Sequence, residues 1–322
     1  MMNSRRIGDI ELIQIIEFSG PTHDADWMLP GLPPAALRAN ASWLNPGFWI
    51  PSTNRLVFTM QLWLLKASDR IIVIDTGVGN AKMRPSPYQS MINTPVLDWL
   101  AAVGAPPDKV TDVVHTHLHG DHVGWDTRQE DGRWTPTFPN ATYYVPKDDW
   151  GAYRPRYDAG DQNLLGGSFA DSIMPVAEAG LVRFFGDDDE ITDCLLAHAA
   201  PGHSPGQVML SLRHGDQHCI FSGDVLHSPM QVLFPDVNSR WCELPDVARA
   251  TRHKLLADAA AANATIFPAH APGLHGWKVA RRGEGYGVTV ADAAPSLVPL
   301  TTEGSSGPST LGACPTHSAR SR

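Results

Sequence analysis

Four side chains of metal-binding type stand within six residues of one another near the middle of the chain. The stretch His115–Gly124 reads HTHLHGDHVG, and inside it His117, His119, Asp121 and His122 form an H-x-H-x-D-H cluster. Imidazole nitrogens and carboxylate oxygens are preferred ligands of Zn²⁺ and of neighbouring first-row metals. The chain has 14 histidines in all, so a chance histidine run on the surface is the weaker interpretation. The cluster predicts a metal site.

Three further candidate ligands follow short apolar runs later in the chain. His203 stands in the turn-rich sequence PGHSPG, Asp224 ends the sequence FSGD and His270 ends IFPAH. Each of the three lies at a strand-to-loop boundary rich in Gly or Pro, which is a turn signal. This repeated placement is what a metal site on one rim of a sheet requires.

Short apolar runs predict the strands that must carry these loops. Lys109–Val114 precedes the histidine cluster, and Thr265–Pro268, expected to be the last strand of its sheet, precedes His270. Two sets of strands, each with a helix and ligand loops, favour a pair of stacked sheets with helices outside. The other expected elements are the strands Ile10–Glu17, Leu56–Leu65, Ile71–Asp75, Ala141–Val145, Gln207–Leu212 and His218–Phe221 and the helices Val96–Val103 and Pro245–Ala262.

Two irregular segments are expected to shape access to the site. Ser19–Pro51 is rich in Pro, Gly and aromatic residues, and long loops with this content are functional more often than disordered. We interpret it as a lid that walls an apolar pocket, and an ordinary hydrophobic wrap remains the alternative. Within it, His23 is expected in a solvated loop rather than at the metal. Gly151–Ala179 is interpreted as an insertion near the entrance of the site.

Bulk properties exclude several classes of protein. The net charge of −9 and the absence of a basic stripe argue against a nucleic-acid partner. The four cysteines show no C-x-x-C pairing, so buried free thiols are expected. The N-terminus lacks the unbroken apolar stretch of a signal peptide, and no window is apolar enough to span a membrane. These features predict a cytoplasmic protein without a membrane partner.

The ordered set HTHLHGDH, PGHSPG, SGD and PAH resembles the metallo-β-lactamase superfamily over roughly residues 56–272. This resemblance implies an α/β fold, a four-layer αββα sandwich. It also implies two Zn²⁺ per chain, although this ligand set accepts other divalent first-row ions. The implied ligands are His117, His119 and His203 for one metal, Asp121, His122 and His270 for the second, and Asp224 as the bridge between them.

The resemblance suggests how the chain is divided and which residue would orient a metal ligand from outside the centre. Residues 1–55 would form a strand and the lid, residues 56–290 the hydrolase domain, and residues 291–322, rich in Ser, Gly, Thr and Pro, a disordered tail. Asp75, in the sequence DTG after a strand, would orient a metal-binding histidine in such a domain. A simple turn-forming aspartate is the alternative interpretation.

The implied chemistry is hydrolysis by a hydroxide that bridges two zinc ions and attacks an apolar lactone or ester. Asp121 and Asp224 would carry protons. His227 stands where acyl-homoserine lactonases of this superfamily typically have a tyrosine, and it would either donate to an oxyanion or pack beneath the loop.

Other functions remain open at this point. One is detoxification, either by hydrolytic dehalogenation of a chloroaromatic such as chlorothalonil or by cleavage of an aryl phosphotriester. The other is the reaction of an iron persulfide dioxygenase. A substrate that is small and apolar is expected in the hydrolase cases. Exposed apolar residues of the lid suggest a homodimer.

Overall fold

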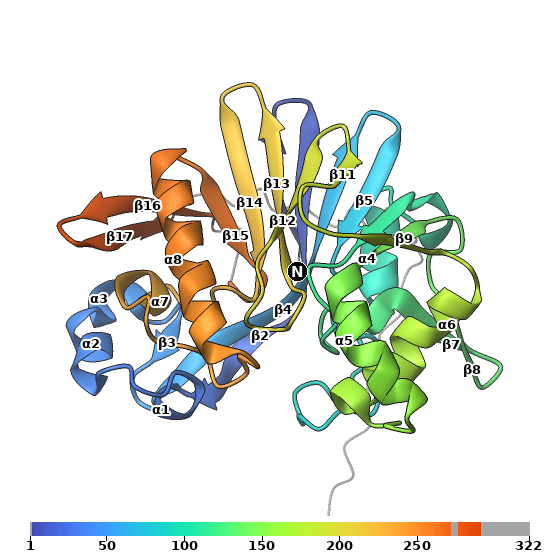
Figure 1. The fold of residues 1–322 in the computed structure, drawn as a ribbon, viewed down its shortest axis with the longest axis horizontal. Coiled ribbons are helices and arrows are strands. Elements are labelled where there is room, and N and C mark those ends of the chain that lie inside the picture. Colours follow the sequence, from blue (N-terminus) through green and yellow to red (C-terminus); the bar gives the residue numbers. More distant parts are fainter. Residues whose placement is uncertain (1, 272–275, 291–322) are drawn as a thin grey trace, which may run out of the picture.

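Two stacked β-sheets form the centre of the computed structural model, which describes residues 2–271 and 276–290 (Figure 1). The first sheet has the order β1 (Met2–Ile7), β2 (Ile10–Asp24), β4 (Arg55–Ala67), β5 (Arg70–Ile74), β6 (Asp112–Val114), β9 (Thr142–Pro146) and β10 (Val182–Phe185), with β3 (Trp49–Ile50) paired to β4. The second sheet has the order β11 (Glu190–Thr192), β12 (Leu195–Ala199), β13 (Val208–His214), β14 (Gln217–Gly223), β15 (Thr265–Pro268), β16 (Trp277–Arg282) and β17 (Gly285–Val290). A separate hairpin joins β7 (Thr127–Glu130) to β8 (Arg133–Pro136).

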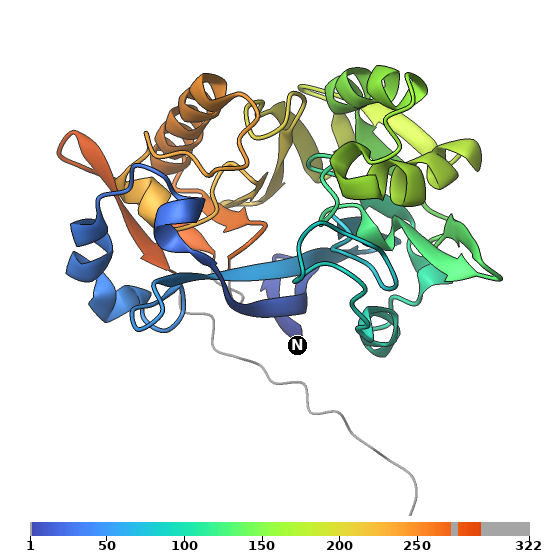
Figure 2. The same cartoon turned by 90° about the horizontal axis from the view of Figure 1, so that it is seen from below.

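Helices cover the outer faces of both sheets. Figure 1 shows α8 on one side of the strands and α4, α5 and α6 on the other, and Figure 2 shows the same separation from below. The α-helices are α1 (Ala25–Met28), α2 (Pro34–Ala39), α3 (Ala41–Leu44), α4 (Val96–Ala102), α5 (Lys147–Asp158), α6 (Met174–Glu178), α7 (Met230–Leu233) and α8 (Pro245–Ala261). Single 3₁₀ or π turns lie at Pro107–Lys109, Gly124–Asp126, Leu164–Gly167 and Phe169–Ile173. The predicted αββα sandwich is confirmed.

The apolar runs of the sequence produce this layering because successive side chains of a strand point to opposite faces. In β4, Leu62 and Leu64 pack on the outer side with Leu100 of α4. Trp63 and Leu65 point inward, where Trp63 contacts Phe221 and Phe267 of the second sheet at ring-centroid distances of 5.8 and 5.3 Å. A strand that is buried on both faces needs a continuous apolar run, and the stretch LWLL at residues 62–65 supplies it.

Three sequence expectations differ from the structure. The predicted strand Ile10–Glu17 continues to Asp24 as β2. It is also not the first strand, because β1 precedes it in the chain and pairs with it. Thr265–Pro268 is not the last strand, because β16 and β17 follow it. The sequence of those two strands alternates few apolar residues with Arg, Gly and Lys, so it carries a weak strand pattern. The predicted tail at 291–322 lies outside the described residues.

The segment Ser19–Pro51 is only partly a lid. Residues 19–24 belong to β2, and most of the large apolar side chains that follow are buried in a core cluster, where Phe48 lies 6.2 Å from the ring of Trp277. Only His23 and Trp27 of this segment line the main cavity. Gly151–Ala179 is largely helical, and Leu165 and Gly166 bring it to the cavity entrance. No helix among the described residues is long and apolar enough to cross a membrane.

Gly124 sits where two loops of the site touch, and we predict that Gly124→Ala destabilises the fold. A Cβ on Gly124 would lie 1.9 Å from the carbonyl carbon and oxygen of Val78, and backbone cannot move as a side chain does. We expect the free energy of unfolding in urea to fall by about 1–3 kcal/mol. The control is Gly151→Ala in α5, where a Cβ meets nothing within 4 Å and should stabilise the helix. Equal stability of the two variants would contradict this packing argument.

Candidate metal centre

The candidate ligands come from loops at one edge of the two sheets. Strands β5 and β6 run parallel to each other, as do β14 and β15, so their carboxyl ends meet at shared edges. The H-x-H-x-D-H loop follows β6, Asp224 follows β14 directly and His270 follows β15. His203 lies in the turn between β12 and β13. The structure therefore brings together all seven ligands implied by the sequence motifs.

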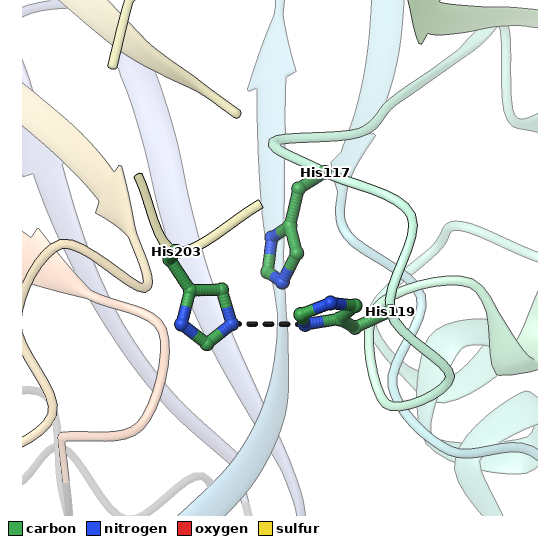
Figure 3. Close-up of side chains that lie close together, drawn as sticks. All are labelled: His117, His119 and His203. Atoms are coloured by element: carbon green, nitrogen blue, oxygen red, sulfur yellow. Dashed lines mark hydrogen bonds between the residues drawn. The ribbon is translucent and has the colours of Figure 1, made fainter. Parts of the chain in front are cut away.

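One triad consists of His117, His119 and His203, whose rings point toward one another in Figure 3. Their ligand nitrogens lie within 4.8 Å of one another, and His119 Nδ1 is 2.9 Å from His203 Nε2. His117 is fully buried, whereas the side chain of His119 is 19% exposed and faces the cavity. Three nitrogens converging on one point are the geometry that a tetrahedral metal requires.

The second triad consists of Asp121, His122 and His270. The Asp121 carboxylate lies 3.8 Å from His122 Nε2 and 3.9 Å from His270 Nε2. Asp224 stands between the triads. Its Oδ2 is 3.2 Å from His203 Nε2, and its Oδ1 is 3.4 Å from His122 Nε2. Both oxygens also lie near His270 Nε2, at 3.0 and 3.1 Å. The carboxylate therefore contacts one triad through His203 and the other through His122 and His270, which is the placement that a bridging ligand requires.

The chemistry of the donor set fits a pair of divalent cations. His117 Nε2 is buried and has no hydrogen-bond partner among the described residues, and the buried Nε2 atoms of His122 and His270 crowd around the carboxylate of Asp224. Buried polar atoms are nearly always satisfied, so such a convergent group indicates an occupant with positive charge. Burial and the imidazoles of His122 and His119 hold the pKa of His117 well below its usual value. Neutral imidazole is the form that binds metals.

Asp224 is held in its charged form. Burial alone would raise the pKa of its carboxyl, but the surrounding imidazoles of His270, His122, His227 and His203 hold that pKa well below the ordinary range. A carboxylate that stays ionised in a fully buried position offers two oxygens to two cations. The motif SGD marks Asp224 as a candidate ligand, and the geometry explains why this position needs an acid.

Outer contacts fix the orientation of the ligand rings. Asp75 Oδ2 is 2.9 Å from His122 Nδ1, and the carbonyl oxygen of Thr59 lies 2.8 Å from His270 Nδ1. Each contact leaves the Nε2 atom of its histidine for the centre. Asp75 itself is anchored by the backbone N–H and hydroxyl of Thr116, both at 2.8 Å. The predicted contact between Asp75 and a ligand histidine is confirmed.

Asp75→Asn tests this outer contact. The amide can still accept from the backbone N–H of Thr116, but it lacks the charge that raises the basicity of His122. We expect metal affinity, measured by competition with a chelating dye, to fall about 10–100-fold. Replacement of a metal ligand should lower metal affinity further than Asp75→Asn does. Wild-type affinity in Asp75→Asn would remove the orienting role of this carboxylate.

Several site residues carry no signal in the sequence. Glu243 Oε1 lies 3.1 Å from His119 Nε2, and Gln89 Nε2 donates to Asp121 Oδ2 over 3.0 Å. Neither residue belongs to a motif, because both approach the centre from distant parts of the chain. His115, the first histidine of the cluster, points away from the ligands, and its Nε2 lies 2.9 Å from Asp126 Oδ2.

His227 lies against the carboxylate of Asp224. Its side chain is fully buried, its Nε2 is 3.1 Å from Asp224 Oδ2, and its backbone N–H donates to Gln231 Oε1. Asp224 lines the main cavity, whereas His227 is not among the described residues that do so. The contact of His227 is therefore with Asp224, and a contact with an oxyanion remains a prediction.

A cavity of about 710 Å³ opens directly onto the centre. Its wall includes His119, Asp121, His203 and Asp224. Facing them is an aromatic group, made of His23, Trp27, Phe58, Tyr88 and Trp241, in which Trp27 stacks on His23 at 5.4 Å and Trp241 meets His23 edge-on at 5.0 Å. His23, expected in a solvated loop, thus lies in the cavity wall.

Comparisons with solved structures agree with the fold. Among solved structures, the hydrolase AbOPH of the beta-lactamase superfamily superposes with a TM-score of 0.75 at 22% identity, covering 91% of this chain and 98% of that one. AidC, described as a dizinc quorum-quenching lactonase, superposes with a TM-score of 0.74 at 19% identity and the same coverage of 91% and 98%. At these identities the likeness shows the fold.

Sequence comparisons give the family. The N-acyl homoserine lactonase AiiB of Agrobacterium fabrum (strain C58) is 28% identical over 97 residues, which are 27% of this chain. The matched part spans only 35% of the length of that lactonase. The sequence model of the Metallo-beta-lactamase superfamily matches residues 61–270, which include every candidate ligand. The chain belongs to the metallo-β-lactamase superfamily.

Proposed function

We propose that the chain is a metal-dependent hydrolase that opens an apolar lactone or cleaves a related ester. The observation that carries this proposal is the cavity, in which the ligand side chains face an aromatic wall. Large aromatic surfaces bind apolar acyl chains or rings by removing them from water. Arg84 also lines the cavity, but Asp171 pairs with its guanidinium at 2.7 Å, so it does not act as a free cation for a charged substrate.

The centre would supply the nucleophile. Two divalent ions held there by the two triads and Asp224 would lower the pKa of a water and polarise the carbonyl of the substrate. Ser204 and Ser222 stand beside the ligands in sequence, but both side chains are fully buried, and Ser204 donates its hydroxyl to Asp149. Asp121 and Asp224 both border the cavity, so these carboxylates can accept the proton and return it to the leaving oxygen.

Two complete triads, each with its ligand atoms within 4.8 Å, can hold the two metals that the proposed hydrolysis uses. The iron dioxygenase is the alternative, and a protein that binds iron alone and consumes oxygen would favour it. Zinc is proposed as the metal because a site of imidazoles and carboxylates suits it. The lactonase descriptions of AiiB and AidC support the choice of a lactone as the first substrate to test.

The test is hydrolysis of acyl-homoserine lactones of increasing chain length by the zinc-loaded protein, followed by acid release at constant pH. We expect metal-dependent ring opening and a KM that falls with chain length. Trp241→Ala should raise KM for the longest chain about tenfold, the effect of about 1.4 kcal/mol of lost apolar contact. Trp43→Ala is the matched control, because Trp43 is 37% exposed and is not among the described residues that line the cavity.

Two other outcomes would redirect the proposal. Absence of turnover by a protein that carries two metals would exclude the lactonase, and chloride release from chlorothalonil or cleavage of an aryl phosphotriester would be measured next. An equal KM for short and long chains would show that the aromatic wall does not contact the acyl group.

A further inference from the structure

The ligand His119 has an acidic neighbour that comes from the other half of the chain. Glu243 precedes α8, and its Oε1 lies 3.1 Å from His119 Nε2. The opposite ring nitrogen, Nδ1, is the one that faces His203 at 2.9 Å. Because a histidine cannot turn its ring while both nitrogens are engaged, this contact fixes which nitrogen is presented to the centre.

The same residue also holds the loop of a second ligand. The backbone N–H of Glu243 donates to the carbonyl oxygen of His203 over 3.0 Å, and the N–H of Leu244 donates to Gly202 over 2.9 Å. Glu243 therefore contacts two of the three histidines of one triad, one through its side chain and one through its backbone. No other described residue outside the centre is recorded in hydrogen bonds to both.

The carboxylate of Glu243 is itself held in place. Tyr153 of α5 is 1% exposed, and its hydroxyl donates to Glu243 Oε1 in a short hydrogen bond. The preceding residues are anchored as well, since Arg240 bonds through its backbone N–H and its Nε to the carbonyl oxygens of Met28 and Trp27, both at 2.9 Å. A carboxylate with fixed backbone and a fixed partner can orient a ring that is 19% exposed.

We infer that Glu243, supported by Tyr153, is a positioning residue that orients His119 and tightens metal binding at the triad of His117, His119 and His203. The inference rests on the metal centre proposed above and not on the identity of the substrate. The carboxylate holds the tautomer of His119 and places a negative charge beside its ring. The Glu243 side chain is 33% exposed, so solvent screens part of this effect.

Metal release from the whole protein tests the inference without any substrate. The wild type, Glu243→Gln, Tyr153→Phe and the control Glu178→Gln are loaded with Co²⁺ and mixed with excess EDTA while the visible absorbance is followed. We expect Glu243→Gln to release one of two ions about tenfold faster, the lower end of the range for outer contacts, with an altered absorption band. Tyr153→Phe should show a smaller change in the same direction. Glu178 is exposed, and its variant should match the wild type.

The outcomes separate the inference from the proposed function. Wild-type release of both ions from Glu243→Gln, while the wild type itself holds two, would overturn the inference alone. A wild type that binds no Co²⁺ would overturn the metal centre and the inference together. If Glu243→Gln lowers the melting temperature of the metal-free protein as much as that of the loaded protein, Glu243 is a structural contact and the inference is wrong. If Glu243→Gln does not fold, Tyr153→Phe decides the question, because it removes only one hydroxyl.

Discussion

Asp224→Ala is expected to abolish turnover and loading of both metals while leaving the fold intact. The two oxygens of this carboxylate lie 3.2 Å from His203 Nε2 and 3.4 Å from His122 Nε2, so its removal takes the ligand shared by the two proposed metals. Loss of a residue that contacts a metal ligand from outside lowers metal affinity about 10–100-fold, and loss of a shared ligand should lower it further. The backbone N–H of Asp224 keeps its bond to Gln207 Oε1 at 3.1 Å, so the loop retains its anchor.

The measurement combines metal content, initial rate and circular dichroism. Asp216→Ala is the matched control, since Asp216 is an exposed aspartate in the turn between β13 and β14. It should keep two metals and the full rate. Stoichiometric metal and full activity in Asp224→Ala would show that the centre lies elsewhere. A loss of the folded spectrum would assign Asp224 a structural role instead.

The candidate ligands can be recognised in the sequence because each lies in a local motif. Four of them occur in one loop, and the others follow strands at turns marked by Gly or Pro, so each motif can be recognised without knowing which strands pair. The sandwich follows from the same runs, since strands such as β4 are apolar on both faces. Asp75 was also predictable, because it stands in DTG at the end of β5.

The rest of the site depends on contacts between distant segments. Glu243 reaches His119 across 124 positions of the chain, and Tyr153 reaches Glu243 across 90. Neither belongs to a periodic pattern or a turn signal, so only the folded backbone brings them together. His23 was misplaced for a similar reason. It appears in a polar stretch of the sequence, but the long β2 strand carries it to the aromatic wall of the cavity.

Removal of the metals is expected to stop turnover completely and to lower the melting temperature. An ion that binds only the folded chain stabilises it by about 4 kcal/mol when its concentration is about 1,000 times Kd. With an unfolding entropy of about 2.1 cal/mol/K per residue, 1 kcal/mol corresponds to about 1.5 °C for 322 residues, so chelation should lower the melting temperature by about 6 °C. The apo protein should remain folded, because the buried cores between and outside the sheets do not involve the centre.

The experiment compares EDTA with EDTA that has been saturated with Zn²⁺ before addition. Only free EDTA should lower the rate and the melting temperature, and added Zn²⁺ should restore both. Metal removal takes the cation from the buried ligand atoms and leaves His117 Nε2 without a partner among the described residues, and such an atom costs about 1–3 kcal/mol. Stability should therefore fall even though no contact of the core is lost. An unchanged melting temperature after verified metal removal would mean that these atoms do not bind a cation in the folded protein.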